Sequence, residues 1–238
     1  MALDSILRVL QSPTKFFDQQ IGEPPHLRFP ALIVVVFMAC RVSANYILFR
    51  KLTGQLPPNL AVGMDWMQFG FGVMLIGVAI ADIIFWIVGT GILTCGNILL
   101  DGDGEYRKLL ELTVFCHAPV LLFGIAVLIF SIVYTPKIDF DEFSTVNIEA
   151  LEKTDRQRHE ETMTEIKSRF LSEVDSTKFK ILGSAATCAY LWLALLVLQA
   201  NARTFRLPLS KSFISVLGVI ALYVVIAISR QKFFPGAI

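Results

Sequence analysis

Charged residues are scarce in this chain. They make up 17% of its 238 residues, whereas soluble domains carry about 25%. Hydrophobic residues reach 55% and the mean hydropathy is +0.63, which excludes an ordinary soluble domain. The formal net charge is only +1, so the charge balance does not indicate a nucleic-acid partner. Several apolar runs reach the length of about 20 residues that a helix needs to cross a bilayer, so the sequence predicts an all-α, polytopic membrane protein.

Motifs for catalysis and metal binding are also missing. The sequence contains no H-E-x-x-H run, phosphate-binding loop or C-x-x-C pair, and His26, His117 and His159 are scattered. The turn from Asp101 to Lys108 contains D-x-D-G but lacks the further ligands of a 12-residue calcium loop. The four cysteines lie in or beside apolar runs, which is typical of small buried thiols. We therefore expect no enzymatic activity, metal or cofactor.

Five apolar runs predict five transmembrane helices. The second run, from Met67 to Leu100, is long enough for a helix of about 50 Å, against a hydrocarbon core of about 30 Å. No Gly or Pro lies beside Asp82 at its middle, so we expect one tilted or protruding helix with its glycines facing neighbouring helices. In the third run, Pro119 should kink or loosen the turn that contains His117. The expected spans are residues 29–49, 67–100, 110–134, 181–200 and 213–229.

The spans divide the chain into four parts. These are an amphipathic segment (1–28), three spans (29–135), a charged insert (136–180) and two spans (181–238).

The N-terminal segment predicts two short helices. Apolar residues recur at helical spacing, and Pro13 opens a second piece that carries Phe16 and Phe17. These helices either lie on the membrane surface or pack on the protein's own helix ends.

The insert predicts a charged helix over residues 148–179. It holds eleven acidic and eight basic residues across 136–180, and it is too short to build a core of its own. The pairs Glu149/Lys153 and Glu165/Arg169 have the acid-then-base spacing that supports a helix. A helix this polar extends from the membrane or packs in an oligomer.

Two opposite charges lie inside the first two spans. A charge in hydrocarbon is costly, so Arg41 and Asp82 need partners, a proton or water. Antiparallel neighbouring helices would place them at similar depth, which favours an intramembrane ion pair that fixes helix packing. The alternative is a polar path through a small transporter or channel, with Asn45 and His117 as further members.

The order of several short motifs resembles the Yip (Ypt-interacting protein) domain family. The motifs are a P-x-x-F-F start at Pro13, a G-E-Y-R-K-L-L turn at Gly104, the third-span Pro119 and a W-x-x-x-L stretch at Trp192. The resemblance covers most of the chain apart from about 137–178. It implies five spans, and eukaryotic members are trafficking factors that bind small Rab-type GTPases.

The N-terminal segment of residues 1–28 is much shorter than the cytosolic region of those members, which argues against GTPase binding and resembles a prokaryotic member. We therefore expect a non-enzymatic membrane organiser or protein-binding scaffold. Its expected partners are the lipid bilayer and another membrane protein or a second copy of the chain.

The charges flanking the spans favour a cytoplasmic N-terminus. Without the insert, eight Lys and Arg residues lie on the N-terminal side and four on the other. The eight basic residues of the insert would reverse this excess, but the rule that lysine and arginine gather on the cytoplasmic side is weak for long acidic loops. The expected location is the plasma membrane of a prokaryote, with the N-terminus in the cytoplasm.

Overall fold

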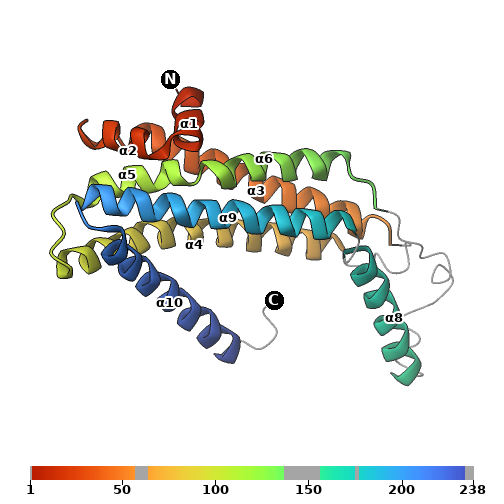
Figure 1. Ribbon diagram of the computed structural model, residues 1–238. Coiled ribbons are helices and arrows are strands. Elements are labelled where there is room, and N and C mark those ends of the chain that lie inside the picture. The colour runs from red at the N-terminus through yellow and green to blue at the C-terminus, as the bar shows by residue number, and fades with distance from the viewer. Residues whose placement is uncertain (1, 57–63, 137–155, 175–176, 234–238) are drawn as a thin grey trace. The chain divides into compact units, whose positions relative to one another are not determined.

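The computed structural model describes residues 2–56, 64–136, 156–174 and 177–233, and these residues form helices joined by turns, without strands (Figure 1). The helices are α1 (Ala2–Gln11), α2 (Pro13–Ile21), α3 (Arg28–Thr53), α4 (Met64–Leu99), α5 (Tyr106–Cys116), α6 (Ala118–Val133), α8 (Arg156–Val174), α9 (Thr177–Thr204) and α10 (Leu209–Phe233).

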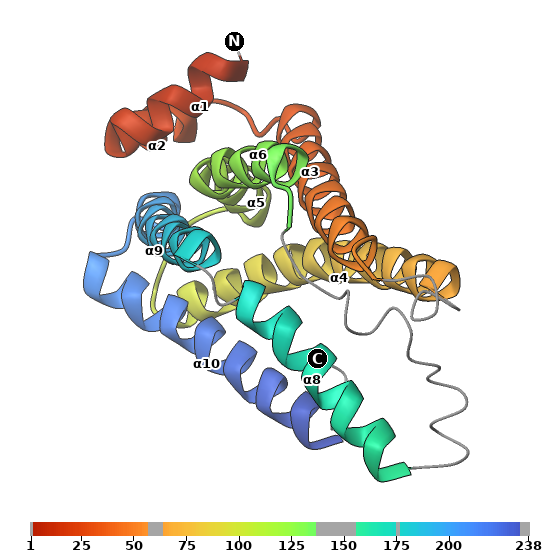
Figure 2. The same cartoon turned by 90° about the vertical axis from the view of Figure 1, so that its right-hand side faces the viewer.

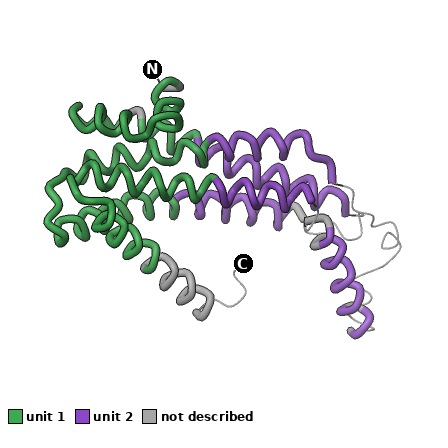
Figure 3. Tube along the Cα trace, in the orientation of Figure 1, with its two compact units in different colours: residues 1–36, 81–121, 189–238 green, residues 37–80, 122–188 purple. Residues whose placement is uncertain are grey.

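Two compact units divide these helices (Figure 3). Unit 1 comprises residues 1–36, 81–121 and 189–238, and unit 2 comprises residues 37–80 and 122–188. Each unit is described by itself below.

Four helical stretches are long and apolar enough to cross a membrane. They are Pro30–Thr53, Trp66–Leu99, Tyr106–Val133 and Thr177–Thr204, and α10 adds a shorter apolar stretch, Leu209–Ala221. The prediction of an all-α, multi-pass membrane protein is confirmed, and α10 (Leu209–Phe233) contains the whole of the expected fifth span, 213–229. The prediction of one uninterrupted helix through Asp82 is also confirmed, because α4 is a single helix of 36 residues.

The third span breaks where its proline predicts. Helix α5 ends at Cys116 and α6 begins at Ala118. The His117 amide donates to the Val114 carbonyl at 2.9 Å. This bond reaches three residues back instead of four, so it closes a tighter turn than an α-helical bond. Pro119 has no amide hydrogen to donate and its ring crowds the preceding turn, which explains the break.

Helices α1 and α2 pack on α5, as both views show (Figure 2). Phe16 and Phe17 are buried, and the Phe16 ring meets the Phe115 ring edge to face with centroids 5.1 Å apart. Burial of each phenylalanine stabilises this packing by about 1.5–3 kcal/mol. The sequence left two alternatives for the N-terminal segment, which were lying on the membrane surface and packing on the protein's own helix ends. The buried face of α1 and α2 takes the second, because it packs on α5.

Two turns of unit 1 lie against each other. The Asp103 amide donates to the Phe205 carbonyl at 3.1 Å, which joins the α4–α5 turn to the α9–α10 turn. A Cβ at Gly102 would come within 2.8 Å of the Asn97 carbonyl oxygen, and one at Gly104 would collide with the Thr204 carbonyl. Beneath the turns, an apolar cluster is formed by Leu93, Leu109, Phe205, Leu207 and Val216. The glycines therefore permit the close approach of two backbones.

The substitution Gly104→Ala should destabilise the protein by about 1–3 kcal/mol, because backbone must move to accept the methyl group. The control is Gly183→Ala on α9, where an added Cβ meets nothing within 4 Å, so its effect should be neutral or slightly stabilising. Thermal unfolding of both purified variants in detergent measures the difference. Equal midpoints would contradict this account of the turns.

The glycines of α4 face neighbours only in part. A Cβ at Gly89 would lie 3.9 Å from Val219 Cγ1, and one at Gly96 would lie 3.6 Å from Ser215 Cβ, so α10 approaches α4 at these positions. A Cβ at Gly70 or Gly77 would meet nothing within 4 Å. The expectation that the glycines face other helices is therefore met at Gly89 and Gly96, whereas no described residue approaches Gly70 or Gly77 as closely.

The thiols also differ from expectation. Cys116 is buried and Cys40 is partly buried, whereas Cys95 and Cys188 are exposed on their helices. The expectation of four buried thiols is wrong for the last two, because an apolar run in a membrane helix need not face the protein interior.

In unit 2, the end of α3 is fastened to the end of α6. The Lys51 ammonium donates to the carbonyls of Ile132 and Tyr134, at 2.5 and 2.8 Å. Carbonyls at a helix end lack partners within the helix, so a lysine there supplies both charge and hydrogen bonds. The Phe179 ring packs edge to face on Tyr134, which brings α9 into the same group.

Helix α8 covers part of the predicted charged helix. The Glu165–Arg169 pair is confirmed, with an oxygen-to-nitrogen distance of 2.9 Å. The Glu149/Lys153 pair lies outside the described residues.

Candidate functional site

The residues of the predicted ion pair belong to different units. Arg41 lies on α3 in unit 2, and Asp82 lies on α4 in unit 1, so their pairing stays a prediction from the sequence. Asn45, proposed for the polar path, is exposed and donates to the Arg41 carbonyl of its own helix at 3.0 Å. Its hydrogen bond is therefore local.

Unit 1 brings Asp82 and His117 into electrostatic interaction. The His117 Nδ1 lies 2.7 Å from the Thr113 carbonyl oxygen, and the Trp86 indole donates to the Thr113 hydroxyl at 2.9 Å. Trp86 is one helical turn after Asp82, so these four side chains gather where α4 meets the break after α5. The Trp86–Thr113 bond joins α4 to α5, whereas the His117–Thr113 bond is local to the end of α5.

A second polar group joins α4, α9 and α10 in unit 1. The Asn97 and Asn201 amides bond reciprocally, with nitrogen-to-oxygen distances of 2.5 and 3.1 Å. The Asn201 nitrogen also lies 2.9 Å from the Ser212 hydroxyl and 3.0 Å from the Ser215 hydroxyl. All four residues are buried, and both asparagines have no exposed surface. An amide that bonds groups on two other helices fixes the register of all three.

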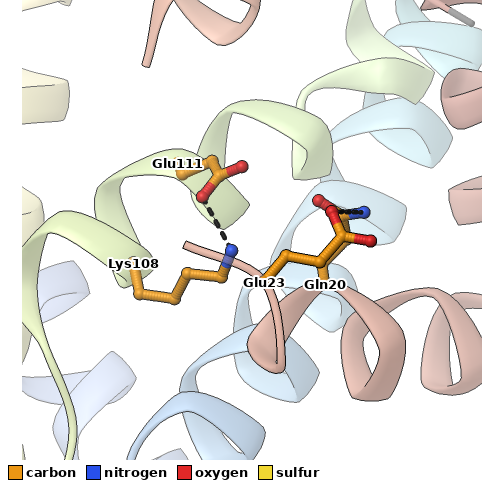
Figure 4. A network of polar contacts seen from close by, with 4 residues as sticks. All are labelled: Gln20, Glu23, Lys108 and Glu111. Carbon is orange, nitrogen blue, oxygen red and sulfur yellow. Dashed lines mark hydrogen bonds and ion pairs between the residues drawn. The ribbon is translucent and has the colours of Figure 1, made fainter. Parts of the chain in front are cut away.

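The third polar group is a buried ion pair on α5. The Lys108 ammonium lies 2.9 Å from the Glu111 carboxylate, and the two residues are only 5% and 3% exposed. Figure 4 shows this pair beside Gln20 and Glu23 at the end of α2, where the Gln20 amide donates to the Glu23 carboxylate at 3.3 Å. A charged pair is tolerated in such a place only when each charge meets its partner.

The described parts of the chain hold no group of three or more His, Cys, Asp or Glu side chains placed to bind a metal ion. The two aspartates of the D-x-D-G turn face basic side chains instead. Asp101 lies 3.7 Å from the Lys211 ammonium, and Asp103 lies 4.0 Å from the Arg206 guanidinium.

Sequence reasoning missed the second and third polar groups. For the ion pair, the signal was an opposite charge three residues after Lys108 at the start of an apolar run. For the asparagines, the signal was an amide near the end of each of two apolar runs, Asn97 and Asn201. No local pattern shows that these two amides meet.

Comparison with known proteins gives one family match. The model of the Yip1 domain matches residues 7–229 of the chain. An uncharacterized protein of the archaeon Methanocaldococcus jannaschii is 24% identical over 119 residues, which is 50% of this chain and 82% of that protein. No solved structure matches the chain.

Proposed function

The chain belongs to the Yip1 domain family, and from that premise we propose that it is a non-enzymatic membrane organiser, a helical scaffold that binds another membrane protein. The observation that carries this proposal is that the buried polar side chains of unit 1 form hydrogen bonds and an ion pair with other side chains of the protein. Asn97 bonds Asn201, and the Lys108 ammonium bonds the Glu111 carboxylate. Side chains committed in this way hold helices in place and leave little for chemistry.

Helix α8 is the element best suited to meet a partner. Glu160, Glu161 and Glu165 are exposed on it, along with much of the rest of its described surface. Its apolar residues form a thin stripe, with Ile166 buried and Met163 partly exposed. The helix carries four acidic and four basic residues and so has no net charge, but these three glutamates line one hollow and form a local acidic patch. Such a patch favours a partner with basic side chains opposite it, because complementary charge guides association and selects the partner.

The orientation proposed from the sequence gains support from unit 1. This unit contains α1, α2 and the turns that end α4 and α9. The eight basic residues counted for the N-terminal side all lie in it: Arg8, Lys15, Arg28, Arg107, Lys108, Arg203, Arg206 and Lys211. Two of the four counted for the other side, Arg230 and Lys232, also belong to unit 1, so the excess within the unit is eight against two. An excess of lysine and arginine marks the cytoplasmic ends of spans, so we assign this end to the cytoplasm of a prokaryotic cell.

Transport is the second candidate, and the interaction between Asp82 and His117 favours it. An ionisable pair inside the spans is a common element of proton relays. Against it, Asp82, His117, Arg41 and Asn45 line neither the hollow beside Glu160 on α8 nor the hollow beside Arg203 on α9.

The test compares partner recovery after cross-linking in native membranes. The double variant Glu160→Lys/Glu161→Lys on α8 should reduce recovery of the partner about tenfold, because the attractive charge becomes repulsive. The matched control is Asp101→Lys/Asp103→Lys, which makes the same charge change on the exposed α4–α5 turn and should leave recovery unchanged.

The opposite outcome is equally specific. In that outcome, the wild type recovers no partner above the background of membranes without the protein. If proteoliposomes with the wild type also conduct protons and those with Asp82→Asn do not, transport is the function. A pH-sensitive dye inside the vesicles reports that flux.

A further inference from the structure

A hollow of about 540 Å³ lies in unit 1, between α2 and the turn that joins α9 to α10. Neither the helix packing described above nor the proposed function uses it. Its lining is formed by Thr14, Asp18, Ile21, Gln199, Ala202, Arg203, Arg206, Leu207 and Leu209.

Two guanidinium groups and one carboxylate line this hollow. Arg203 lies 3.2 Å from the Asp18 carboxylate, and both side chains are about half exposed. Arg206 lies 4.0 Å from Asp103, and its side chain is 80% exposed. Exposed ion pairs at such distances are weak, so an entering anion can replace these partners. The net charge of the lining is positive, and guanidinium groups bind phosphate through paired hydrogen bonds.

The remaining lining matches a ligand with an apolar part. Ile21, Leu207 and Leu209 supply hydrocarbon surface beside the two arginines. The hollow also lies at the end of a span, because Arg203 is in the last turn of α9 and Leu209 begins α10. At the end of a span the surrounding bilayer changes from acyl chains to head groups. A free phosphate would use only the charged half of this surface.

The backbone at Arg206 adds an independent observation. Its φ is 54°, in the left-handed region that favours glycine. A residue other than glycine in this region has a less stable backbone, and such positions cluster at functional sites. Here the left-handed residue belongs to the turn that ends α9, in which the Leu207 amide donates to the Ala202 carbonyl at 3.0 Å, and this turn holds Arg206 at the rim of the hollow.

We propose that this hollow binds the head group of an anionic phospholipid, with the lipid phosphate held by Arg203 and Arg206 and the glycerol and upper acyl carbons lying on Ile21, Leu207 and Leu209. Thr14 and Gln199, whose side chains form a long hydrogen bond of 3.5 Å with each other, also line the hollow. Occupancy of this site would depend on the content of anionic lipid in the leaflet around the hollow. The site does not depend on any partner at α8.

The test measures thermal unfolding of the full-length protein in an uncharged detergent. Added phosphatidylglycerol should raise the midpoint by several degrees, since a ligand that binds only the folded state stabilises it, whereas phosphatidylcholine should have a much smaller effect. The double variant Arg203→Gln/Arg206→Gln should bind phosphatidylglycerol about tenfold more weakly. The matched control Arg8→Gln/Arg107→Gln removes the same charge from exposed residues of unit 1 outside the hollow, and it should bind like the wild type.

A second variant keeps the proposal open to refutation if the arginine variant does not fold. Asp18→Asn removes the carboxylate that competes for Arg203, so it should bind phosphatidylglycerol several-fold more tightly. Weaker binding by Asp18→Asn, or equal loss in the Arg8/Arg107 control, would overturn the site. Glycerol 1-phosphate is a soluble phosphate ester without acyl chains. At millimolar concentration it should not raise the midpoint of thermal unfolding. If it protects as well as the lipid, the ligand is a free phosphate and the lipid assignment is wrong.

Discussion

Replacing Glu111 by leucine should destabilise the protein by about 3–5 kcal/mol, because it leaves the Lys108 ammonium buried without its counter-charge. The pair lies on α5 with 2.9 Å between nitrogen and oxygen, and both residues are almost fully buried. Water cannot easily replace the lost carboxylate there. In thermal unfolding of the purified protein, a loss of this size lowers the midpoint by on the order of 10 °C.

The double variant Lys108→Leu/Glu111→Leu distinguishes a structural pair from a working one. With both charges removed, stability should return to within about 1 kcal/mol of the wild type or exceed it, because desolvation of the ions no longer opposes folding. The control is Glu165→Leu on α8, which breaks an exposed pair of similar geometry and should cost less than about 1 kcal/mol. A double variant as unstable as Glu111→Leu alone would contradict this assignment.

Replacing Asn201 by alanine should destabilise the protein by about 2–4 kcal/mol. The change removes the reciprocal bond to Asn97 and the contacts with Ser212 and Ser215, and it leaves a buried amide without its partner. Each interhelical hydrogen bond in a membrane protein contributes about 0.6–2 kcal/mol, and several are lost together. Denaturant titration in mixed micelles measures the change.

The matched control is Asn45→Ala. Asn45 is exposed, and within the part of the chain that the structure describes it bonds the carbonyl of Arg41 on its own helix, so its loss should cost less than about 0.5 kcal/mol. A double-mutant cycle of Asn97→Ala and Asn201→Ala should give a coupling of about 1–2 kcal/mol, because the two amides bond each other. Additive effects would show that the asparagines act separately.

Much of the fold could be predicted from the sequence because the bilayer limits the choices. Backbone groups in hydrocarbon must bond within their own segment, so a long apolar run becomes a helix. This is why α4 continues through Asp82 without a turn, and why the break after Cys116 follows from Pro119. The order of short motifs also indicated the Yip family, which the match over residues 7–229 confirms.

The candidate site was predicted less well, because its residues meet through tertiary packing. Asp82 and His117 stood out as ionisable residues in apolar runs, and unit 1 brings them into electrostatic interaction. Asn97 and Asn201 did not stand out as a pair, since 104 positions separate them. The Arg41–Asp82 ion pair stays a prediction. If the pair is structural, the double variant Arg41→Leu/Asp82→Leu should regain the stability that Asp82→Asn alone loses.

By itself, the sequence determined that this protein is helical, crosses the membrane several times and belongs to a known family type. Those properties follow from sums over neighbouring residues, namely hydropathy along a run and the spacing of prolines and glycines. Only the tertiary structure decided that α1 and α2 fold back on α5, that Lys108 and Glu111 become buried, and which amides bond one another. Hydrogen bonds act over about 3 Å, so a polar side chain acquires its role only when packing brings its partner within that distance.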